Sequence, residues 1–237
     1  MSTIDDFKNK GFSQITIPIS KQEFEDTVFS YREFDKNTSE KEKEKTNYTY
    51  NKNSRVIFGY NSRSDIEGFD NKSYFQFNPD INQKNYIKDN KYYTKFINNI
   101  NSVYTKVAKV IIQIIEELDS QNYINKNDFL NKENKPDLNL RILNYKPKSE
   151  CTMLAKNHVD RGILTLTLYE TEDGLYFVHK GKEIEIKYKE NQGNLFIATR
   201  WNEFSNEKID ALEHLVKNKG YNKERSAIVV FVNPNLG

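Results

Sequence analysis

The sequence predicts a mainly β domain with helices packed against it, which places it in the α+β class. Two patterns lead to this prediction. Six short segments after residue 136 have the composition of strands and are separated by Gly, Asp or Asn turns. Before them, residues 91–119 repeat apolar side chains with the period of an α-helix. Short strands at such spacing are typical of a sandwich or a barrel.

The first expected elements are a strand and a helix. Residues 12–19 read FSQITIPI, and their apolar and polar side chains alternate as in a strand. Ser20 and Glu23 then form the pattern of a capping box, which predicts a short helix to about Tyr31. Residues 35–53 alternate charge and have almost no aliphatic side chains, so we expect a solvated loop or a fraying helix there.

Residues 91–119 are expected to form a scaffold helix. Their apolar residues recur at three- and four-residue steps, which gives one continuous stripe for packing against a sheet. After Pro136 the pattern changes to the period of a strand. The predicted strands are residues 138–145, 162–169, 175–179, 182–188, 194–199 and 226–232.

Composition and charge exclude several classes of protein. Lys and Arg number 36 against 34 Asp and Glu, so the net charge of +2 supplies no field for a polyanion, and neither nucleic acid nor a membrane is an expected partner. The single cysteine, Cys151, excludes an intrachain disulfide and a multi-cysteine zinc site. A single cysteine fits the reducing environment of the cytoplasm. No segment has the pattern of a secretory leader or of an apolar membrane span.

The length fits one domain over residues 1–237. Within it we expect residues 1–136 to be an N-terminal helical support region and residues 137–237 to form the core that carries the site. An aromatic fraction of 13% argues against disorder. We expect a cytoplasmic monomer or weak oligomer.

One of the three histidines begins a possible metal motif. His158 is followed two residues later by Asp160, and on a strand these positions would face the same side. Two imidazoles and one carboxylate leave three positions of an octahedron open, as non-haem iron(II) oxygenases require for a co-substrate and dioxygen. His214 would complete the set. A histidine with an acid two positions on is common by chance, but a following strand pattern and Arg225 shortly after His214 are much harder to obtain by accident.

In these segments the chain resembles the isopenicillin N synthase-like group of Fe(II)/2-oxoglutarate-dependent oxygenases. The resemblance is specific in the second half of the chain and weaker in the first. It is carried by LRILNYKP (140–147), NHVDRGILTLTLYETEDGLYFV (157–178), GNLFIATRWNEFSN (193–206), His214 and RSAIVVFVNP (225–234).

The resemblance implies a double-stranded β-helix, or jelly roll, with helices packed outside it. It implies that His158, Asp160 and His214 bind Fe(II), that Arg225 pairs with the far carboxylate of 2-oxoglutarate, and that Tyr145 contacts this co-substrate. The implied reaction is hydroxylation, or a related oxidation, of a small-molecule substrate by O₂, with release of succinate and CO₂.

Two positions depart from the family pattern. The family has Arg, any residue, Ser, whereas this chain has Arg225, Ser226 and Ala227, so the expected hydroxyl is absent and Ser226 should face the other way on a strand. Tyr145 is followed by Lys146, where many relatives have another tyrosine. We expect co-substrate binding to survive, because a hydrogen bond to a charged group is stronger than a neutral one.

The remaining candidates carry weaker signals. Arg161, Arg200 and Trp201 lie beside the matched segments and could contact a substrate, although a surface or packing role is at least as plausible for each. His179 lies outside the motif and is expected to be structural or exposed. Cys151 is not favoured as a nucleophile, because nothing in the sequence supplies the other members of a catalytic set.

Two other functions stay open. The first is an oxidase of the same fold that needs no 2-oxo acid, and the presence of Arg225 argues mildly against it. The second is a non-catalytic jelly-roll module that keeps the metal site for stability or binds a partner. Intact ligands at all three positions argue against that interpretation.

Overall fold

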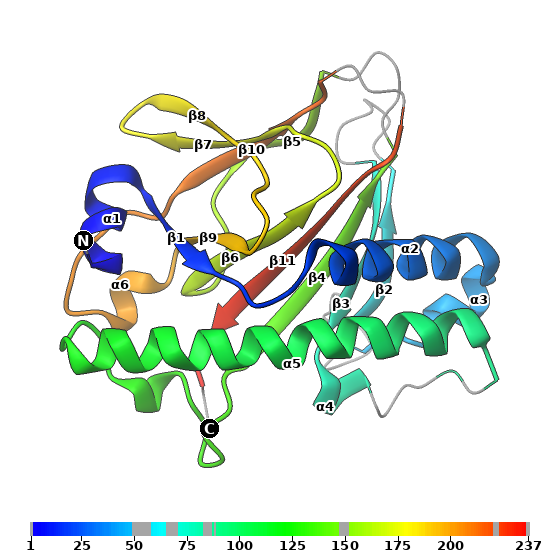
Figure 1. Cartoon of the computed structure of the whole chain (residues 1–237), viewed down its shortest axis with the longest axis horizontal. Helices are drawn as coiled ribbons and strands as arrows, with labels where there is room; N and C mark the ends of the chain where they lie inside the picture. The colour runs from blue at the N-terminus through cyan, green and yellow to red at the C-terminus, as the bar shows by residue number, and fades with distance from the viewer. Residues whose placement is uncertain are drawn as a thin grey trace.

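Two antiparallel sheets form the centre of the molecule (Figure 1). The computed structural model describes residues 2–48, 58–64, 71–82, 87, 89–146, 152–219 and 223–235, so Cys151 lies outside the described residues. The major sheet has the strand order β1 (Phe12–Thr16), β9 (Gln192–Ile197), β6 (Leu164–Glu170), β11 (Arg225–Asn233), β4 (Asp137–Tyr145), β3 (Lys72–Phe77) and β2 (Gly59–Arg63). The minor sheet has the order β5 (Met153–His158), β10 (Glu213–Lys217), β7 (Leu175–His179) and β8 (Lys182–Ile186).

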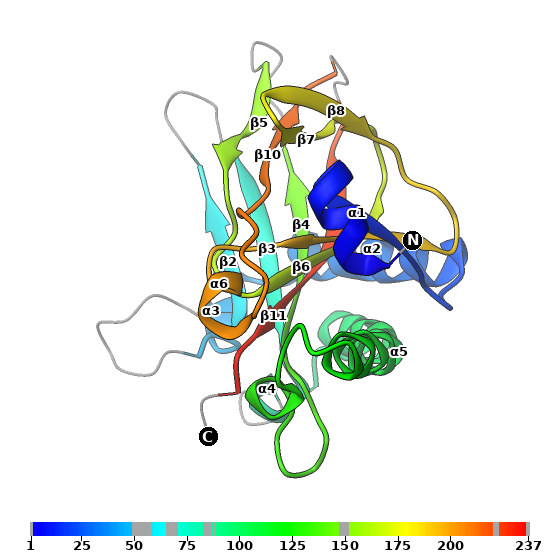
Figure 2. The ribbon, with the colours of Figure 1, turned by 90° about the vertical axis from the view of Figure 1, so that its left-hand side faces the viewer.

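Helices cover the outer face of the major sheet. The long helix α5 (Lys91–Ser120) and helix α2 (Lys21–Asn37) pack against each other and against this face, and Figure 2 shows α5 nearly end-on beside the sheet. The remaining helical segments are α1 (Thr3–Lys10), α3 (Glu40–Glu44), α4 (Pro79–Asn82), the 3₁₀ turn η2 (Lys126–Asp128) and α6 (Trp201–Phe204). None of the helices in the described ranges has the length and apolar character needed to cross a bilayer.

Side-chain alternation on the central strands separates two cores. On β4, Leu138, Leu140 and Ile142 belong to the core between the major sheet and the helices. Leu143 and Tyr145, on the other face of the same strand, belong to the core between the two sheets. Alternate residues of the central strands therefore face the space between the two sheets. The candidate functional site lies in this space.

The structure confirms the predicted mainly β fold with packed helices. Helix α5 ends within one residue of the prediction, and all six predicted strands are present with boundaries shifted by up to two residues. The sequence patterns missed β5 and β10, which are short segments that mix polar and apolar residues, and also β2 and β3. Strands β1, β2 and β3 lie within residues 1–136, so the N-terminal region contributes strands to the major sheet as well as helices.

The expectation of a solvated segment at residues 35–53 is wrong for its first part. Helix α2 continues to Asn37, α3 follows, and the side chains of Asp35 and Lys43 are only 5% and 4% exposed. Both charges are buried because each has a partner of opposite sign, which offsets the loss of hydration. Residues 49–53 lie outside the described residues.

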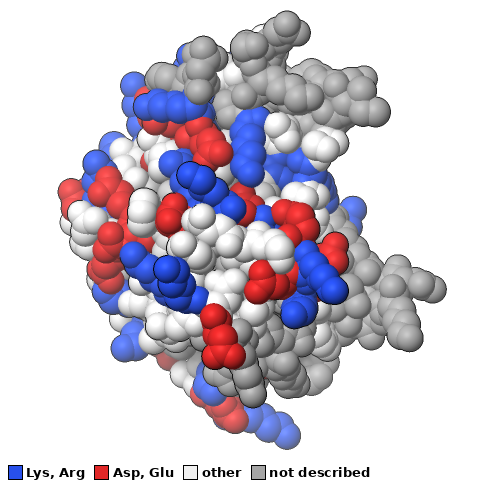
Figure 3. Space-filling view, turned by 90° about the vertical axis from the view of Figure 1, so that its right-hand side faces the viewer, with Lys and Arg blue, Asp and Glu red and all other residues white. Residues whose placement is uncertain are grey.

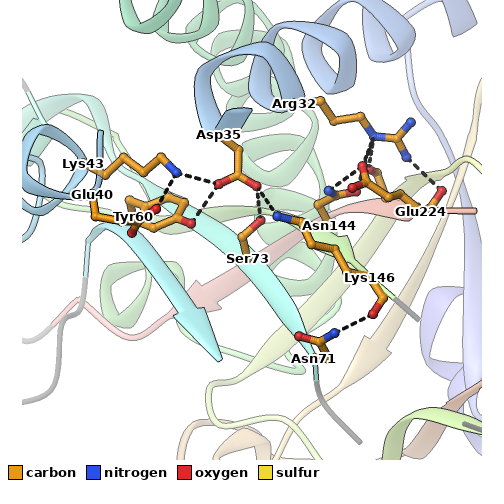
Figure 4. A network of polar contacts seen from close by, with 11 residues as sticks. Arg32, Asp35, Glu40, Lys43, Tyr60, Asn71, Ser73, Asn144, Lys146 and Glu224 are labelled. Atoms are coloured by element: carbon orange, nitrogen blue, oxygen red, sulfur yellow. Dashed lines mark hydrogen bonds and ion pairs between the residues drawn. The ribbon is translucent and has the colours of Figure 1, made fainter. Parts of the chain in front are cut away.

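Asp35 is the centre of a buried polar network that fixes α2 to the sheet (Figure 4). Its carboxylate accepts hydrogen bonds from Lys43 Nζ (3.0 Å), Tyr60 Oη (2.8 Å), Ser73 Oγ (2.8 Å) and Lys146 Nζ (2.9 Å). Burial opposes its ionisation, but the hydrogen bonds outweigh burial, so the pKa of Asp35 lies below its ordinary value. The network connects α2 to α3, β2, β3 and the residue that follows β4.

Candidate metal centre and adjoining cavities

The two histidines of the predicted motif lie side by side on the minor sheet. His158 is the last residue of β5 and pairs in register with His214 on the neighbouring strand β10. Their ring centroids are 4.2 Å apart. Antiparallel pairing therefore brings together two residues that are far apart in the sequence.

Asp160 reaches the same point in a way that the sequence argument did not foresee. The chain leaves β5 at His158, so the strand alternation invoked for positions 158 and 160 is wrong. Hydrogen bonds hold Asp160 instead: Thr165 Oγ1 donates to its Oδ2 (2.9 Å), and the Thr199 amide donates to its backbone carbonyl (3.1 Å). These bonds tie the turn to β6 and to the segment after β9.

The donor atoms of the three residues fit a divalent metal. One ligand atom from each of His158, Asp160 and His214 lies within 4.8 Å of the others, with the Nε2 atoms 3.8 and 3.5 Å from the Asp160 carboxylate oxygens. The Nδ1 atoms lie 2.7 Å from the Lys156 carbonyl and 3.3 Å from the Leu212 carbonyl, which favours protonated Nδ1 and leaves Nε2 to bind a metal. Two imidazoles and one carboxylate are the donor set suited to non-haem iron(II).

The two histidines have different surroundings. His214 is buried, with the rings of Phe196 and Phe177 at 5.2 and 6.5 Å, and burial lowers its pKa, which favours the neutral imidazole that a metal requires. The side chain of His158 is 44% exposed. The centre is thus closed on the side of His214 and open on the side of His158.

An inner cavity of about 110 Å³ extends from the three candidate metal ligands between the sheets and reaches Arg225 on β11. The Arg225 side chain is 5% exposed, and its guanidinium carbon lies 5.7 Å from the centre of the Tyr145 ring on the paired strand β4. Its Nε donates to the Glu172 carbonyl at 3.0 Å. The cavity is therefore lined by the candidate metal ligands and also by a buried guanidinium.

Sequence reasoning missed the residue that pairs with this cation. The carboxylate of Glu170, at the end of β6, accepts a hydrogen bond from Arg225 within the cavity lining, and its side chain is 8% exposed. Burial raises the pKa of Glu170, and the neighbouring guanidinium opposes that rise. The sequence signal for Glu170 is only an acidic residue at the end of a buried strand. Local patterns do not show that β6 pairs with β11.

Strand alternation keeps the Ser226 hydroxyl away from the inner cavity, so it does not replace the hydroxyl expected at position 227. Ala227 lines the inner cavity, whereas Ser226 faces the helices, as predicted. Ser226 Oγ donates to Asn144 Oδ1 (2.8 Å) and accepts from Arg32 Nε (3.1 Å), so this hydroxyl links α2 to β4 and β11. It has no access to the cavity.

The remaining sequence candidates are spread over different environments. Arg161 is exposed and lines an outer cavity beside the metal ligands. Arg200 forms a surface ion pair with Glu203 at 2.8 Å. Trp201 is fully buried, donates from Nε1 to a backbone carbonyl and packs on Phe7, so it belongs to the hydrophobic core.

His179 lies apart from the other two histidines. It ends β7 and packs against Gly11 beside α1. Its ring is not part of the three-residue group of potential metal ligands. Burial lowers its pKa. This placement agrees with the structural role expected from the sequence.

The outer cavity, of about 510 Å³, opens beside His158 and Asp160. Its lining is rich in basic residues, which come from several strands and the turn after β5. Among the described residues that line it, Asp160 is the single carboxylate. The basic residues are Arg63, Lys72, Arg141, Lys156 and Arg161.

Comparison with known proteins gives structural matches only. No family model and no curated protein sequence matches the chain. A full-length Neurospora crassa protein, solved in complex with alpha-KG and 5-formyluracil, is similar over 98% of this chain and 77% of its own, with a TM-score of 0.77 and 21% identity. Arabidopsis thaliana DAO1, a dioxygenase for auxin oxidation solved with 2-oxoglutarate, covers 95% of this chain and 84% of its own, with a TM-score of 0.67 and 16% identity.

A third solved structure, JOX2 in complex with 2OG, Fe and JA, covers 98% of this chain and 70% of its own, with a TM-score of 0.62 and 20% identity. At these identities the similarity concerns the fold. The two antiparallel sheets and the packed helices of this chain have the same arrangement as in these proteins. The chain therefore has the jelly-roll fold of structurally characterised Fe(II)/2-oxoglutarate oxygenases.

Proposed function

We propose that the protein is an Fe(II)- and 2-oxoglutarate-dependent oxygenase that acts on a small molecule. The observation that carries the proposal is the inner cavity, which joins a two-histidine, one-carboxylate centre to the buried guanidinium of Arg225. Metal ligands alone would fit many functions. A buried cation in the same cavity additionally fits a co-substrate with two acidic ends.

The residues around the centre and the inner cavity would have different parts in this function. His158, Asp160 and His214 would hold the metal, and their backbone and Thr165 contacts fix the donor atoms. Arg225 would bind the far carboxylate of 2-oxoglutarate, beside the ring of Tyr145. Phe177 and Phe196 exclude water from the closed side of the centre.

Bound iron would supply the oxidation chemistry, in which 2-oxoglutarate, O₂ and a substrate C–H bond give succinate, CO₂ and a C–OH group. The chain contributes metal geometry, orientation of the co-substrate and exclusion of water. Hydroxylation, desaturation and ring closure would all use the same ligands.

One observation favours a second candidate, an iron oxidase of the same fold that uses no 2-oxo acid. Arg225 already pairs with the buried carboxylate of Glu170, so a co-substrate carboxylate would have to share or replace this partner. The first candidate is preferred, because Arg225 lies in the cavity lining with the metal ligands.

The test is turnover of labelled 2-oxoglutarate by the protein reconstituted with Fe(II) and ascorbate. We expect about one iron per chain and slow, O₂-dependent release of CO₂ even without a substrate. His158→Ala and His214→Ala should each lose iron and turnover, while His179→Ala, outside the centre, should keep both.

Two results would separate the candidate functions, and a third would test the assigned ligands. Iron binding without any binding of 2-oxoglutarate at millimolar concentration would favour the oxidase. Iron binding together with 2-oxoglutarate binding but no CO₂ release would favour a non-catalytic module. Full iron content in both ligand variants would contradict the assigned centre.

A further inference from the structure

We propose that Glu170 is a further co-substrate-binding residue, which takes up one proton from solvent when 2-oxoglutarate binds and then donates a hydrogen bond to its far carboxylate. This inference rests on the proposed function, because it concerns the same inner cavity and the same co-substrate. It is carried by the position of Glu170 beside Arg225 and by the part of the guanidinium that Glu170 leaves unoccupied.

Glu170 and Arg225 face the inner cavity together. Glu170 pairs in register with Ala227 on β11, and paired residues of neighbouring strands point to the same side of a sheet. Arg225 lies two residues before Ala227 on this strand and therefore on the same face. All three residues line the inner cavity. The carboxyl group of Glu170 is thus held next to the side chain that would bind the far end of 2-oxoglutarate.

The guanidinium of Arg225 can accommodate a second acidic partner. Its Nε donates to the Glu172 carbonyl at 3.0 Å, and its Nη2 donates to the carboxylate of Glu170. The third nitrogen, Nη1, has no hydrogen-bond partner among the residues that the structure describes. A ligand carboxylate that binds Nη1 therefore lies beside the carboxyl group of Glu170, on the adjacent nitrogen of one planar fork.

Two ionised carboxylates on this one guanidinium would repel each other. The side chains of Arg225 and Glu170 are 5% and 8% exposed, so solvent and salt screen the repulsion only weakly. Where two carboxylates share a site, the pKa of one of them rises strongly. Uptake of a proton by Glu170 removes the repulsion and converts a competing acceptor into a hydrogen-bond donor.

The surroundings of Glu170 favour this proton more than those of surface carboxylates do. Figure 3 shows acidic side chains at the surface of one face, interspersed with basic ones. Glu170 is instead enclosed between the two sheets. Burial raises the pKa of Glu170 above its ordinary value, the Arg225 guanidinium opposes this rise, and the carboxylate of Asp173 adds to it.

Among the described residues, Arg225 is the one charged partner that contacts Glu170. Lys72 reaches the cavity from β3, but Tyr145 lies between it and Arg225 in the row of paired residues across the sheet. Burial raises the pKa of the neighbouring Tyr169 to about 12, so this hydroxyl stays protonated near neutral pH. The other titratable groups around this region are Arg141 on β4, Glu172 and Asp173 after β6, Tyr188 after β8, Glu25 and Arg32 on α2, and the candidate metal ligands.

The experiment counts protons by calorimetry. 2-Oxoglutarate is titrated anaerobically into the Fe(II)-loaded protein between about pH 6 and 9, in PIPES, HEPES and Tris, whose heats of ionisation differ. The dependence of the heat on the buffer gives the number of protons taken up. At its maximum, uptake by wild type should exceed that by Glu170→Gln by about one proton per ligand, and wild-type affinity should fall by up to about tenfold per pH unit as the pH rises. Affinity in Glu170→Gln should vary much less.

Matched variants separate the donor from the charge. Glu170→Gln and Glu170→Met both remove the charge and keep the length of the side chain, but only Gln keeps a donor. We expect the Gln variant to bind 2-oxoglutarate about fivefold or more tightly than the Met variant. Glu203→Gln, at the surface ion pair with Arg200, should keep the wild-type proton uptake.

Infrared difference spectra of the wild type locate the proton and need no variant, so they remain informative if the Glu170 variants fold poorly. A carboxylic acid band should appear when 2-oxoglutarate binds, and it should not shift when the carboxylates of the ligand are labelled with carbon-13. A band that shifts with the label would place the proton on the ligand and overturn the inference.

The remaining outcomes separate this inference from the proposed function. Binding of 2-oxoglutarate with equal proton uptake in wild type and Glu170→Gln, or equal affinity of the Gln and Met variants, would overturn the inference alone. Absence of binding at millimolar concentration would overturn it together with the proposed oxygenase. Binding with Glu170-dependent proton uptake but without CO₂ release would count against the oxygenase and support the role of Glu170.

Discussion

Arg225 and Glu170 form a buried ion pair, on which co-substrate binding would depend in the proposed function. Their side chains are 5% and 8% exposed, so removal of either partner leaves a buried charge without compensation. In the proposed function, the carboxylate of 2-oxoglutarate competes with Glu170 for the same guanidinium. Variants of the two residues therefore have opposite expected effects.

Arg225→Ala should raise the apparent binding constant for 2-oxoglutarate by about one to three decades, or roughly 1.5 to 4 kcal/mol, through loss of a charged contact. Titration of 2-oxoglutarate into the anaerobic iron protein measures this. Ala227→Ser, which adds a hydroxyl on the cavity face of the same strand, should tighten binding by no more than about tenfold. Arg225→Ala with unchanged affinity would support the oxidase.

Glu170→Gln should tighten the binding of 2-oxoglutarate, because it removes the competing charge and nearly preserves the shape of the side chain. We expect a change of about three- to tenfold in the dissociation constant. The double variant Arg225→Ala/Glu170→Gln tests the coupling, since the effect of Glu170→Gln should disappear without the guanidinium. Weaker binding in Glu170→Gln would mean that Glu170 positions Arg225 and does not compete with the co-substrate.

At the scale of elements, α2 and α5 are the scaffold of the major sheet. Helix α5 presents a continuous buried stripe to the sheet and α2, which includes Val107, Ile111 and Ile115. Helix α2 is fixed by its apolar face and also by the Asp35 network. Neither helix contributes a residue to the lining of the two cavities described above.

Ile111→Ala should lower the free energy of unfolding by about 2 to 5 kcal/mol, because it opens space in a fully packed core. Iron and 2-oxoglutarate binding by the folded fraction should be unchanged. Gln113→Ala, on the exposed side of the same helix, is the matched control and should change stability by less than about 0.5 kcal/mol. Denaturant unfolding measures both, and an Ile111 variant of native stability that fails to bind iron would contradict a purely structural role for α5.

Asp35→Asn should destabilise the fold by about 3 to 5 kcal/mol at pH 7, because it removes the charge that compensates the buried Lys43. The pKa of Asp35 is lowered in the folded state, so its stabilising contribution is present above the unfolded pKa of about 3.9 and is lost as the pH falls through the folded value. The difference between wild type and variant should therefore shrink only below about pH 4. Urea unfolding from neutral to acidic pH measures this, with exposed Asp26→Asn as the control.

At the scale of the whole molecule, a metal bound by His158, Asp160 and His214 would join the minor sheet to the turn that carries Asp160. A metal that binds only the folded state stabilises it by about 2.7 kcal/mol at 100 times its dissociation constant. For a chain of this size we expect Tm to rise by about 5 to 10 °C on anaerobic addition of Fe(II), and a chelator to reverse the rise. His214→Ala should show no rise. An equal rise in His158→Ala/His214→Ala would place the metal elsewhere.

Local sequence patterns were sufficient for the long elements, and they singled out the three candidate metal ligands that the structure brings together. The stripe of α5 and the runs of β4, β6 and β11 have strong periodicity, which depends only on neighbouring residues. The capping box at Ser20 placed the start of α2 correctly for the same reason. Strands β5 and β10 were missed because short segments of mixed polarity have no clear local pattern and acquire their structure from pairing with neighbouring strands.

The sequence by itself determined the fold class, and it proposed His158, Asp160 and His214 as candidate ligands and Arg225 as the candidate anchor. Only the tertiary structure decided which groups these residues meet. Glu170 reaches Arg225 because β6 pairs with β11, and Arg141 and Arg161 share a cavity although one lies on a strand of the major sheet and the other on a turn beside the minor sheet. The physical reason is that strand pairing joins segments distant in the sequence, whereas periodicity records only which face of its own element a residue occupies.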